Sequence, residues 1–397
     1  MINSNVNKRK AELADILRDG MDEYYLKFGN IPAKLRKVSA HICLCKTPHL
    51  GGRVYKCDNC GTQKISFNSC RDRHCPKCQG VARAVWVEKR TSELLPVGYF
   101  HIVFTVPDSF NGIRLKMKKA FFDILYRSAA ETLLTLGRDK RWLGAEIGFL
   151  GILHTWGQQL FEHPHLHCIV PGGGIRLDGK KWVNFRNDFS FPVKVMSRLF
   201  RGKFLAYFSQ AIKDMSLDFP QSNCPDGINE FIRQQREKEW VVYAKEPFGS
   251  AEQVVKYLGR YTHRVAISNN RIVKYENDQV TFSWKDYSDN DKEKEMTVDV
   301  AEFIHRYFFH VLPDRFVRIR YFGILSNRGK TAKLARCFQL LNRRQCKKEI
   351  PDNSMATMIK AISGIDITKC PQCSEGYFEE VRVILKIPDY KRYAFAA

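Results

Sequence analysis

The stretch HPHLHCIVPGGG, residues 163–174, places histidines at alternate positions and then continues into an apolar run and three glycines. Leu166 and residues 168–170 favour a β-strand, and the Pro-Gly sequence that follows favours its end. Because successive side chains of a strand point to opposite faces, His165 and His167 share one face while Leu166 faces the other. The pattern therefore predicts a strand with an apolar face and a pair of neighbouring imidazoles.

Two neutral imidazoles on one rigid strand suit a divalent metal ion. A His-x-His pattern is also typical of surface histidines and of structural histidines held by hydrogen bonds. A second motif with compatible chemistry is needed to separate the two interpretations.

Composition limits the classes of partner. The chain has 397 residues, 44% of them hydrophobic, which is typical of a globular protein with two or three domains. Lysine and arginine number 65 against 42 aspartate and glutamate, a net charge of +23. This excess favours nucleic acid as the partner, because no apolar run is long enough to span a membrane. The alternative is a basic protein with no polyanionic partner.

The first ten residues, MINSNVNKRK, lack the apolar region of a secretion signal, so we expect a cytoplasmic protein. In that compartment the 13 cysteines favour metal ligands or buried thiols over disulfides. Two Cys-x-x-Cys pairs, Cys57 with Cys60 and Cys75 with Cys78, are separated by 14 residues. Two such pairs complete a tetrahedral site, so we expect these four thiolates to bind one structural Zn²⁺.

The same segment holds candidates for a second zinc site. Three further potential ligands are Cys45, Cys70 and His74. A fourth would come from His41, Cys43 or His49. The extra thiols could also be buried without a metal. We therefore expect one or two structural zinc ions here.

Basic residues lie among these cysteines. Arg71, Arg73 and Lys77 suit contact with the DNA backbone, although small zinc modules also serve structural or protein-contact roles. Near the C-terminus, Cys370 and Cys373 repeat one Cys-x-x-Cys pair, but no second pair is near them in the sequence. A further zinc site there is therefore less expected than the first, and the role of Cys370 and Cys373 stays open.

A second motif, KYLGRYTHRVAIS at 256–268, contains two tyrosines. On a helix, Tyr257 and Tyr261 lie on one face because they are four residues apart, a spacing that is also typical of core packing. Arg260 and Arg264 add positive charge and could contact DNA. Joined with a metal on the histidine pair, the tyrosines fit one reaction: the metal polarises a phosphodiester and a phenol attacks it, forming a phosphotyrosine.

The rest of the chain mixes helices with strands that can pair antiparallel, so we expect an α+β fold. Strands are predicted over 99–107 and 148–157, helices over 113–137, 193–218, 251–264 and 299–312, and a hairpin over 271–287 with Asn277-Asp278 at its turn. The expected divisions are a helical arm (1–40), a zinc-binding, DNA-binding module (41–95), a catalytic core (96–335) and a basic tail with the Cys-x-x-Cys pair (336–397).

Several motifs together resemble a known family, in the expected order along the chain. They are CKTPHLGGRVYKCDNCGTQKISFNSCRDRHCPKCQ, YFHIVFTVP, ILHTWGQQL, HPHLHCIVPGGG, YLGRYTHRVAIS and HVLPDRFVRIRYFGILSNR. They are similar to motifs of the two-tyrosine HUH transposases of bacterial insertion sequences, the IS91 family, where HUH denotes His, an apolar residue and His. The resemblance extends from about residue 35 to residue 340.

The resemblance implies an HUH-endonuclease core, whose central antiparallel sheet carries the HUH strand, with a zinc-ribbon-like module before it. It also implies rolling-circle-type transposition, in which single-stranded DNA is nicked at an element end, held as a 5′-phosphotyrosine and transferred to a target. A catalytic Mg²⁺ or Mn²⁺ and a nucleoid-associated location in a bacterium belong to the same expectation.

Residue by residue, His165 and His167 match the metal ligands of that family, and Tyr257 and Tyr261 match its nucleophiles. HUH sites generally need a third polar ligand. We expect Gln158 to be this third ligand. It lies on or just after the strand that precedes the HUH strand, and it shares one face of that strand with His154 and Trp156. Its competitors are Gln159, Glu162 and His163.

Three other functions fit parts of the pattern. A zinc-dependent DNA-binding regulator would leave the HUH strand and the paired tyrosines unexplained. A tyrosine recombinase would use His263 and Arg264 without a metal and would leave a 3′-phosphotyrosine. A replication initiator or relaxase of the HUH class uses the same catalytic groups and differs in its DNA substrate.

Overall fold

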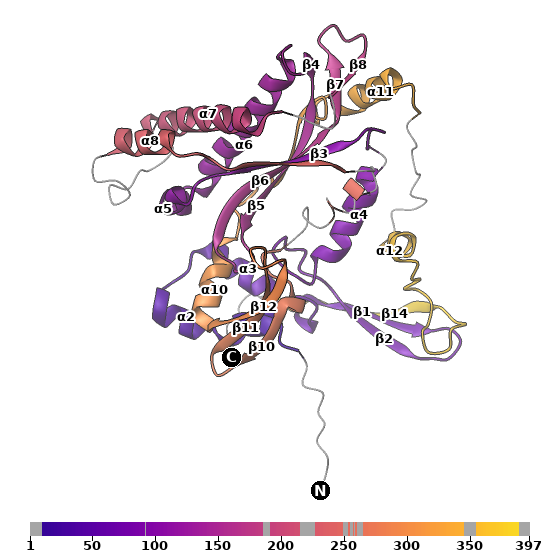
Figure 1. The fold of residues 1–397 in the computed structure, drawn as a ribbon. Helices are drawn as coiled ribbons and strands as arrows, with labels where there is room; N and C mark the ends of the chain where they lie inside the picture. The colour runs from indigo at the N-terminus through magenta and orange to yellow at the C-terminus, as the bar shows by residue number, and fades with distance from the viewer. Residues whose placement is uncertain are drawn as a thin grey trace.

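A five-stranded antiparallel sheet crosses the upper part of the molecule (Figure 1), in the order β13-β5-β6-β3-β9. Its strands are β13 Ile319–Gly323, β5 Gly148–Trp156, β6 Glu162–Pro171, β3 Tyr99–Thr105 and β9 Val242–Phe248. The three histidines quoted first lie on β6, which is paired on both sides. The computed structural model describes residues 10–91, 93–185, 191–214, 227–248, 253–254, 257, 259, 265–344 and 355–388.

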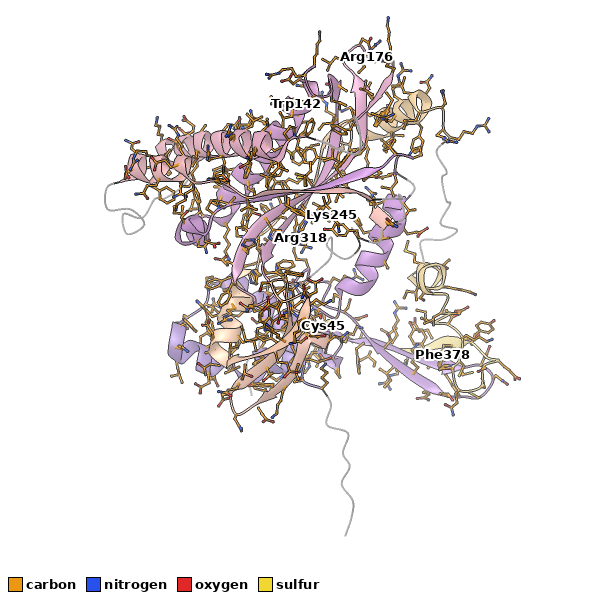
Figure 2. All side chains as sticks on the ribbon, viewed as in Figure 1. Cys45, Trp142, Arg176, Lys245, Arg318 and Phe378 are labelled. Atoms are coloured by element: carbon orange, nitrogen blue, oxygen red, sulfur yellow. The ribbon has the colours of Figure 1, made fainter. Side chains whose placement is uncertain are left out.

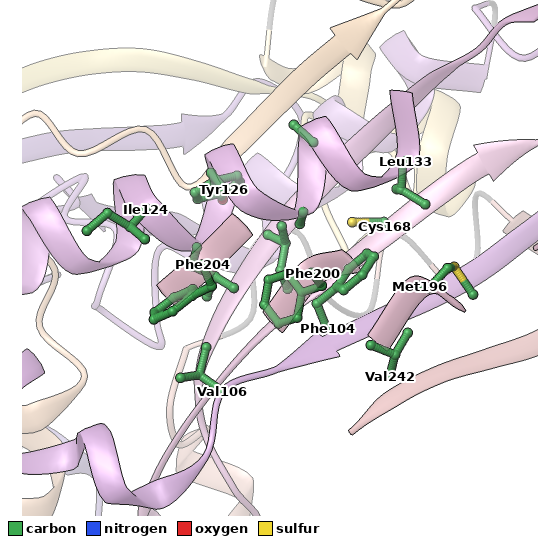
Figure 3. Packing of buried hydrophobic residues seen from close by; sticks show 14 of the residues in the cluster. Phe104, Val106, Ile124, Tyr126, Leu133, Cys168, Met196, Phe200, Phe204 and Val242 are labelled. Atoms are coloured by element: carbon green, nitrogen blue, oxygen red, sulfur yellow. The ribbon is translucent and has the colours of Figure 1, made fainter. Parts of the chain in front are cut away.

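One face of this sheet is covered by two long helices, α6 Lys118–Arg138 and α7 Val193–Lys213. Leu166 and Cys168 of β6 point into the apolar layer between sheet and helices, where Phe104 of β3 meets Phe200 of α7 at a ring-centroid distance of 4.8 Å. Figure 3 shows this packing. Burying one full face of β6 fixes its register, because a slip of one residue would exchange its apolar and histidine faces.

A second body lies below the sheet in Figure 1 and joins both halves of the chain. It contains α1 Leu13–Asp19, α2 Met21–Phe28, α3 Ala33–Cys43, α10 Val300–Phe309 and a sheet of β10 Ile272–Glu276, β11 Gln279–Asp286 and β12 Lys292–Asp299. Apolar residues of all three N-terminal helices share one buried cluster with α10 and this sheet. The predicted hairpin is present, and its turn residues Asn277 and Asp278 have φ of 49° and 53°.

A narrow three-stranded sheet projects from this body at the lower right of Figure 1. Its order is β14-β1-β2, with β1 Gly52–Cys57, β2 Gln63–Phe67 and β14 Phe378–Ile384. The last described strand of the chain therefore pairs with its first.

The remaining elements are short or peripheral. They are α4 Gln79–Thr91, α5 Asn111–Lys116, α8 Ile228–Glu237, α11 Lys330–Leu340, α12 Met355–Ser363, β4 Ala145–Glu146, β7 Gly173–Arg176 and β8 Trp182–Asn184. Single 3₁₀ turns, written η, are η1 Pro48–Leu50, η2 Asp108–Phe110 and η4 Asn269–Arg271.

The expected α+β class with antiparallel sheets is confirmed. The predicted helix over 251–264 lies mostly outside the described residues, although Tyr257 is placed. Among the described residues, no helix is both long and apolar enough to cross a membrane.

Candidate active site and metal centres

Three histidines converge on the open face of the central sheet. His165 and His167 lie on β6, and His154 lies opposite His165 on the neighbouring strand β5. One ring nitrogen of each lies within 4.8 Å of those of the other two. We call His154, His165 and His167 the histidine cluster. Side chains on adjacent strands contact one another only when they project from the same face of the sheet. The alternation seen in the sequence places His165 and His167 on the face that also carries His154.

The third imidazole of this cluster is His154, which the sequence pattern did not single out as a ligand, and Gln158 stays a prediction. Strand β5 ends at Trp156, and its pairing with β6 shifts between His154 and Trp156. Gln158 lies beyond that point and donates its amide to the hydroxyl of Tyr287 at 2.6 Å. Face alternation predicts the direction of a side chain only within a regular strand, so it does not fix the direction of Gln158.

Hydrogen bonds orient two of the three imidazoles. His165 Nδ1 lies 2.6 Å from the carbonyl oxygen of His163, so Nδ1 carries the proton and Nε2 remains as the ligand atom. His167 Nδ1 lies 2.7 Å from Nε2 of His101, a buried residue of β3. Burial lowers the pKa of His165 to about 4, so this imidazole is neutral at pH 7, the form that binds metal.

Sequence reasoning missed His101. It is a single histidine in an apolar strand, and only the β3–β6 pairing shows that it faces the HUH strand. Its ring stacks on that of His167 with centroids 5.0 Å apart. Burial is the main cause that lowers the pKa of His101 to about 4, with Lys245 and His165 adding to it.

Of the two motif tyrosines, Tyr257 is the one that the structure describes, and its hydroxyl contacts His101. Its hydroxyl lies 3.1 Å from each ring nitrogen of His101. The structure thus connects a candidate nucleophile to His167, a candidate metal ligand, through one intervening imidazole. Tyr261, Arg260 and Arg264, also singled out from the sequence, lie outside the described residues.

The cysteines form two clusters, and the pairing differs from the one expected. The first, here the junction cluster, joins Cys45 and Cys70 to Cys75 and Cys78, with Cys78 Sγ 3.4 Å from Cys45 Sγ and 3.6 Å from Cys70 Sγ. Figure 2 marks Cys45 in the lower body of the molecule. Four sulfurs at this spacing match a tetrahedral zinc site, whose 2.3 Å Zn–S bonds place sulfurs about 3.8 Å apart.

Cys57 and Cys60 are absent from the junction cluster, which corrects their expected pairing with Cys75 and Cys78. They lie at the tip of the β1–β2 hairpin, whereas Cys45 and Cys70 lie near its base. The six residues of β1 span five steps of about 3.3 Å, which separates its two ends by roughly 16 Å. At the tip, Cys57 and Cys60 meet Cys370 and Cys373 instead. We call these four residues the ribbon cluster.

His74 is not a ligand of either cluster. Its Nδ1 lies 2.8 Å from Asp72 Oδ1, and its Nε2 accepts a hydrogen bond from the backbone N–H of Leu312 at 3.2 Å. Of the open fourth-ligand candidates, His41 contacts Asp72 at 3.0 Å and the Cys43 thiol points to the Ala14 carbonyl at 3.6 Å. Both are therefore accounted for without a metal.

Comparisons with known proteins agree with this architecture. A family model described as "Transposase zinc-binding domain" matches residues 16–106, and one described as "Putative transposase" matches residues 148–333. A protein of Sinorhizobium fredii (strain NBRC 101917 / NGR234), named "Putative transposase y4qJ", is 45% identical over 383 residues, covering 94% of this chain and 95% of the relative. The chain belongs to the IS91 family of transposases.

A further relative is the "Transposase for insertion sequence element IS801" of Pseudomonas savastanoi pv. phaseolicola. It is 28% identical over 335 residues, which cover 83% of this transposase and 79% of the relative. No solved structure matches.

Residues between the junction-cluster cysteines of this transposase contact the segment 307–316. His74 receives two hydrogen bonds from that segment, one from Leu312 N–H and one to its carbonyl from the Tyr307 hydroxyl at 3.0 Å. Arg73 donates to the carbonyl of Phe316 at 2.7 Å. Arg73 and His74 therefore contact the residues that precede β13, the strand that pairs with β5.

Two of the three basic residues expected to bind DNA have a protein partner. The Arg73 guanidinium donates a hydrogen bond to the Phe316 carbonyl, and Lys77 forms an ion pair with Glu12 at 2.5 Å. Arg71 is exposed. Contact of Arg71 with DNA stays a prediction.

Proposed function

We propose that this transposase nicks and rejoins single-stranded DNA at insertion-sequence ends through a 5′-phosphotyrosine intermediate, with Tyr257 as a nucleophile. The observation that carries this proposal is the contact of the Tyr257 hydroxyl with His101, which in turn bonds to His167 of the histidine cluster. Tyr261 would be the second nucleophile, as the sequence motif suggests.

The histidine cluster fits a catalytic Mg²⁺ or Mn²⁺. His165 and His167 each have Nδ1 engaged with a neighbour, so each offers Nε2, and His154 completes the set. Such an ion, when bound, polarises the scissile phosphodiester and neutralises its oxygens. With three protein ligands, coordination positions remain for the substrate phosphate.

The protons on these rings determine what His101 does for the tyrosine. If His167 binds through Nε2, its Nδ1 carries a proton and donates to His101 Nε2. His101 is neutral, so its own proton is on Nδ1, within reach of the Tyr257 oxygen at 3.1 Å. His101 then donates to that oxygen and stabilises the phenolate, which a free phenol forms only near pH 10.

The proposed reaction replaces one phosphoester bond with another. The Tyr257 oxygen attacks phosphorus, the bond from phosphorus to the 3′ oxygen breaks, and that oxygen leaves as a 3′ hydroxyl after taking a proton. The phenolic proton passes to solvent. Because one phosphoester replaces another, the strand can be rejoined by the reverse attack without ATP.

An unpaired strand suits this site. Phe161, just before β6, is half exposed, and the Arg306 guanidinium lies 4.2 Å from the centre of its ring. An exposed aromatic ring next to a cation is the combination that stacks bases and holds phosphates in single-strand grooves. With a net charge of +23, binding should weaken steeply as salt is raised.

The test is a cleavage assay on labelled single strands that tile the DNA flanking the gene of this transposase, with Mg²⁺ or Mn²⁺. We expect a protein–DNA adduct that survives SDS, is 5′-linked and disappears with EDTA. Its yield should fall by roughly 10³-fold or more in the Tyr257→Phe, Tyr261→Phe double variant. Tyr207→Phe is the control, because its hydroxyl contacts Glu131 on the opposite face of the sheet.

Other outcomes would point to other functions. Retention of DNA without any adduct would favour a non-catalytic zinc-dependent DNA-binding protein. A 3′-linked adduct that forms in EDTA would favour a tyrosine recombinase. Cleavage at a plasmid origin and not at element ends would favour a replication initiator or relaxase.

A further inference from the structure

The four sulfurs of the ribbon cluster have the geometry of a metal site. Cys57 Sγ lies 3.7 Å from Cys373 Sγ, and Cys60 Sγ lies 3.8 Å from Cys370 Sγ. All four sulfurs are within 4.8 Å of one another. These distances are far longer than a disulfide bond of about 2.05 Å and equal the edge of a zinc tetrathiolate, about 3.8 Å.

The two halves of the cluster also have the same backbone turn, although they are 310 residues apart. The residue after the second cysteine is left-handed in both, Gly61 with φ of 72° and Ser374 with φ of 60°. Gly61 N–H bonds to the Cys57 carbonyl at 3.1 Å, and Ser374 N–H to the Cys370 carbonyl at 3.0 Å. Two equivalent turns that present two thiols each are the halves of a zinc ribbon.

Backbone amides point at the sulfurs as they do around bound metals. Cys60 N–H approaches Cys57 Sγ at 3.5 Å, and Gly376 N–H approaches Cys373 Sγ at 3.3 Å. Such bonds stabilise thiolates, the form that binds zinc. Gly376 is also sterically required, because a Cβ there would lie 2.5 Å from Cys57 Sγ.

Contacts beside the cysteines hold the two halves in place. Asp58 Oδ1 accepts from Tyr377 N–H at 2.8 Å, and the Asp58 N–H bonds to the Tyr377 carbonyl at 3.1 Å. From there β14 pairs with β1 along its whole length, from Cys57 opposite Phe378 to Gly52 opposite Ile384. The approach of the two cysteine pairs is therefore built into the sheet.

We propose that Cys57, Cys60, Cys370 and Cys373 bind a zinc ion of their own, which closes a zinc ribbon from opposite ends of the chain. The zinc-binding family model ends at residue 106 and the transposase model at residue 333, so neither contains Cys370 or Cys373. The junction cluster binds one zinc within the N-terminal segment, and the ribbon cluster adds a second that fixes the C-terminal segment onto it.

The test counts metals in the full-length protein, produced with zinc supplied, by elemental mass spectrometry. We expect the Cys370→Ser, Cys373→Ser double variant to hold one zinc ion fewer per chain than the wild type, whatever ion the histidine cluster takes up. Cys337→Ser is the matched control, since this cysteine is buried in α11 outside both clusters, and should keep the wild-type count. Equal zinc content in the double variant and the wild type, or loss of iron in place of zinc, would overturn the proposal.

A second measurement uses the unaltered protein and does not depend on how the variants fold. Cys60 is exposed, so as a metal-free thiol it would react readily with iodoacetamide. We expect peptide mapping to show Cys60 and Cys373 protected until a chelator is added. Rapid labelling of Cys60 without chelator would contradict the zinc assignment.

Discussion

The two cysteine clusters use the same chemistry in different structural settings. The junction cluster comes from Cys45 to Cys78, is largely buried, and lies against the segment that leads into β13. The ribbon cluster joins positions 57 and 373 on a projecting sheet, with Cys60 exposed. Residues within the first contact the segment 307–316, whereas the second lies where a peripheral sheet is closed by β14. Substitutions at the two clusters should therefore differ in how far their effects spread.

The largest effect is expected from Cys75→Ser in the junction cluster. Cys75 is fully buried, and a structural zinc site contributes about 10–16 kcal/mol in small zinc domains, as much as a whole domain's stability. We expect the cooperative thermal transition of the N-terminal body to disappear. Calorimetry would measure this, with Cys43→Ala as the control because Cys43 is buried nearby but belongs to neither cluster. A normal transition in Cys75→Ser would show that the junction cluster is dispensable.

A smaller effect is expected from His74→Ala, which separates the contact with the core from metal binding. The change removes the acceptor of Leu312 N–H and a partner of Asp72, at a cost of about 1–3 kcal/mol. Urea denaturation would measure this loss, while zinc content should stay unchanged. A drop in zinc per chain would mean that His74 is a ligand after all. His163→Ala, on an exposed histidine, is the control.

The smallest effect is expected from Arg53→Ala on the ribbon. Arg53 pairs with Glu380 across β1 and β14, and both side chains are substantially exposed. Exposed pairs of this kind contribute less than about 1 kcal/mol and are screened by salt. The denaturation midpoint should hardly move, and the zinc count should not change. A large loss of stability would show that the sheet depends on this pair more than on its cysteines.

Local sequence patterns predicted the parts of the site that depend on local structure. Alternation in β6 was enough to place His165 and His167 on one face and Leu166 in the core. Alternation does not fix the direction of Gln158, because the β5 ladder shifts and ends before that residue. His101 carried no local signal, since only the pairing of β3 with β6 brings it to His167.

The cysteine pairing could not be predicted from spacing for a related reason. Two Cys-x-x-Cys pairs 14 residues apart favour a shared site only if the chain between them turns back at once. Here a hairpin intervenes and carries Cys57 away from Cys75. The correct partners, Cys370 and Cys373, are separated from it by more than 300 residues, and no local pattern specifies such a contact.

Because β14 is synthesised long after β1, the sheet that they share is completed late in translation. At about 5–20 residues per second, a ribosome needs roughly 15–60 s to travel the 310 residues from Cys60 to Cys370. During that interval β1 has β2 on one side and an open edge on the other, a template for wrong pairing. A gene copy that has lost its 3′ end would leave that edge open permanently. Completion of this sheet thus requires that translation has passed Ile384.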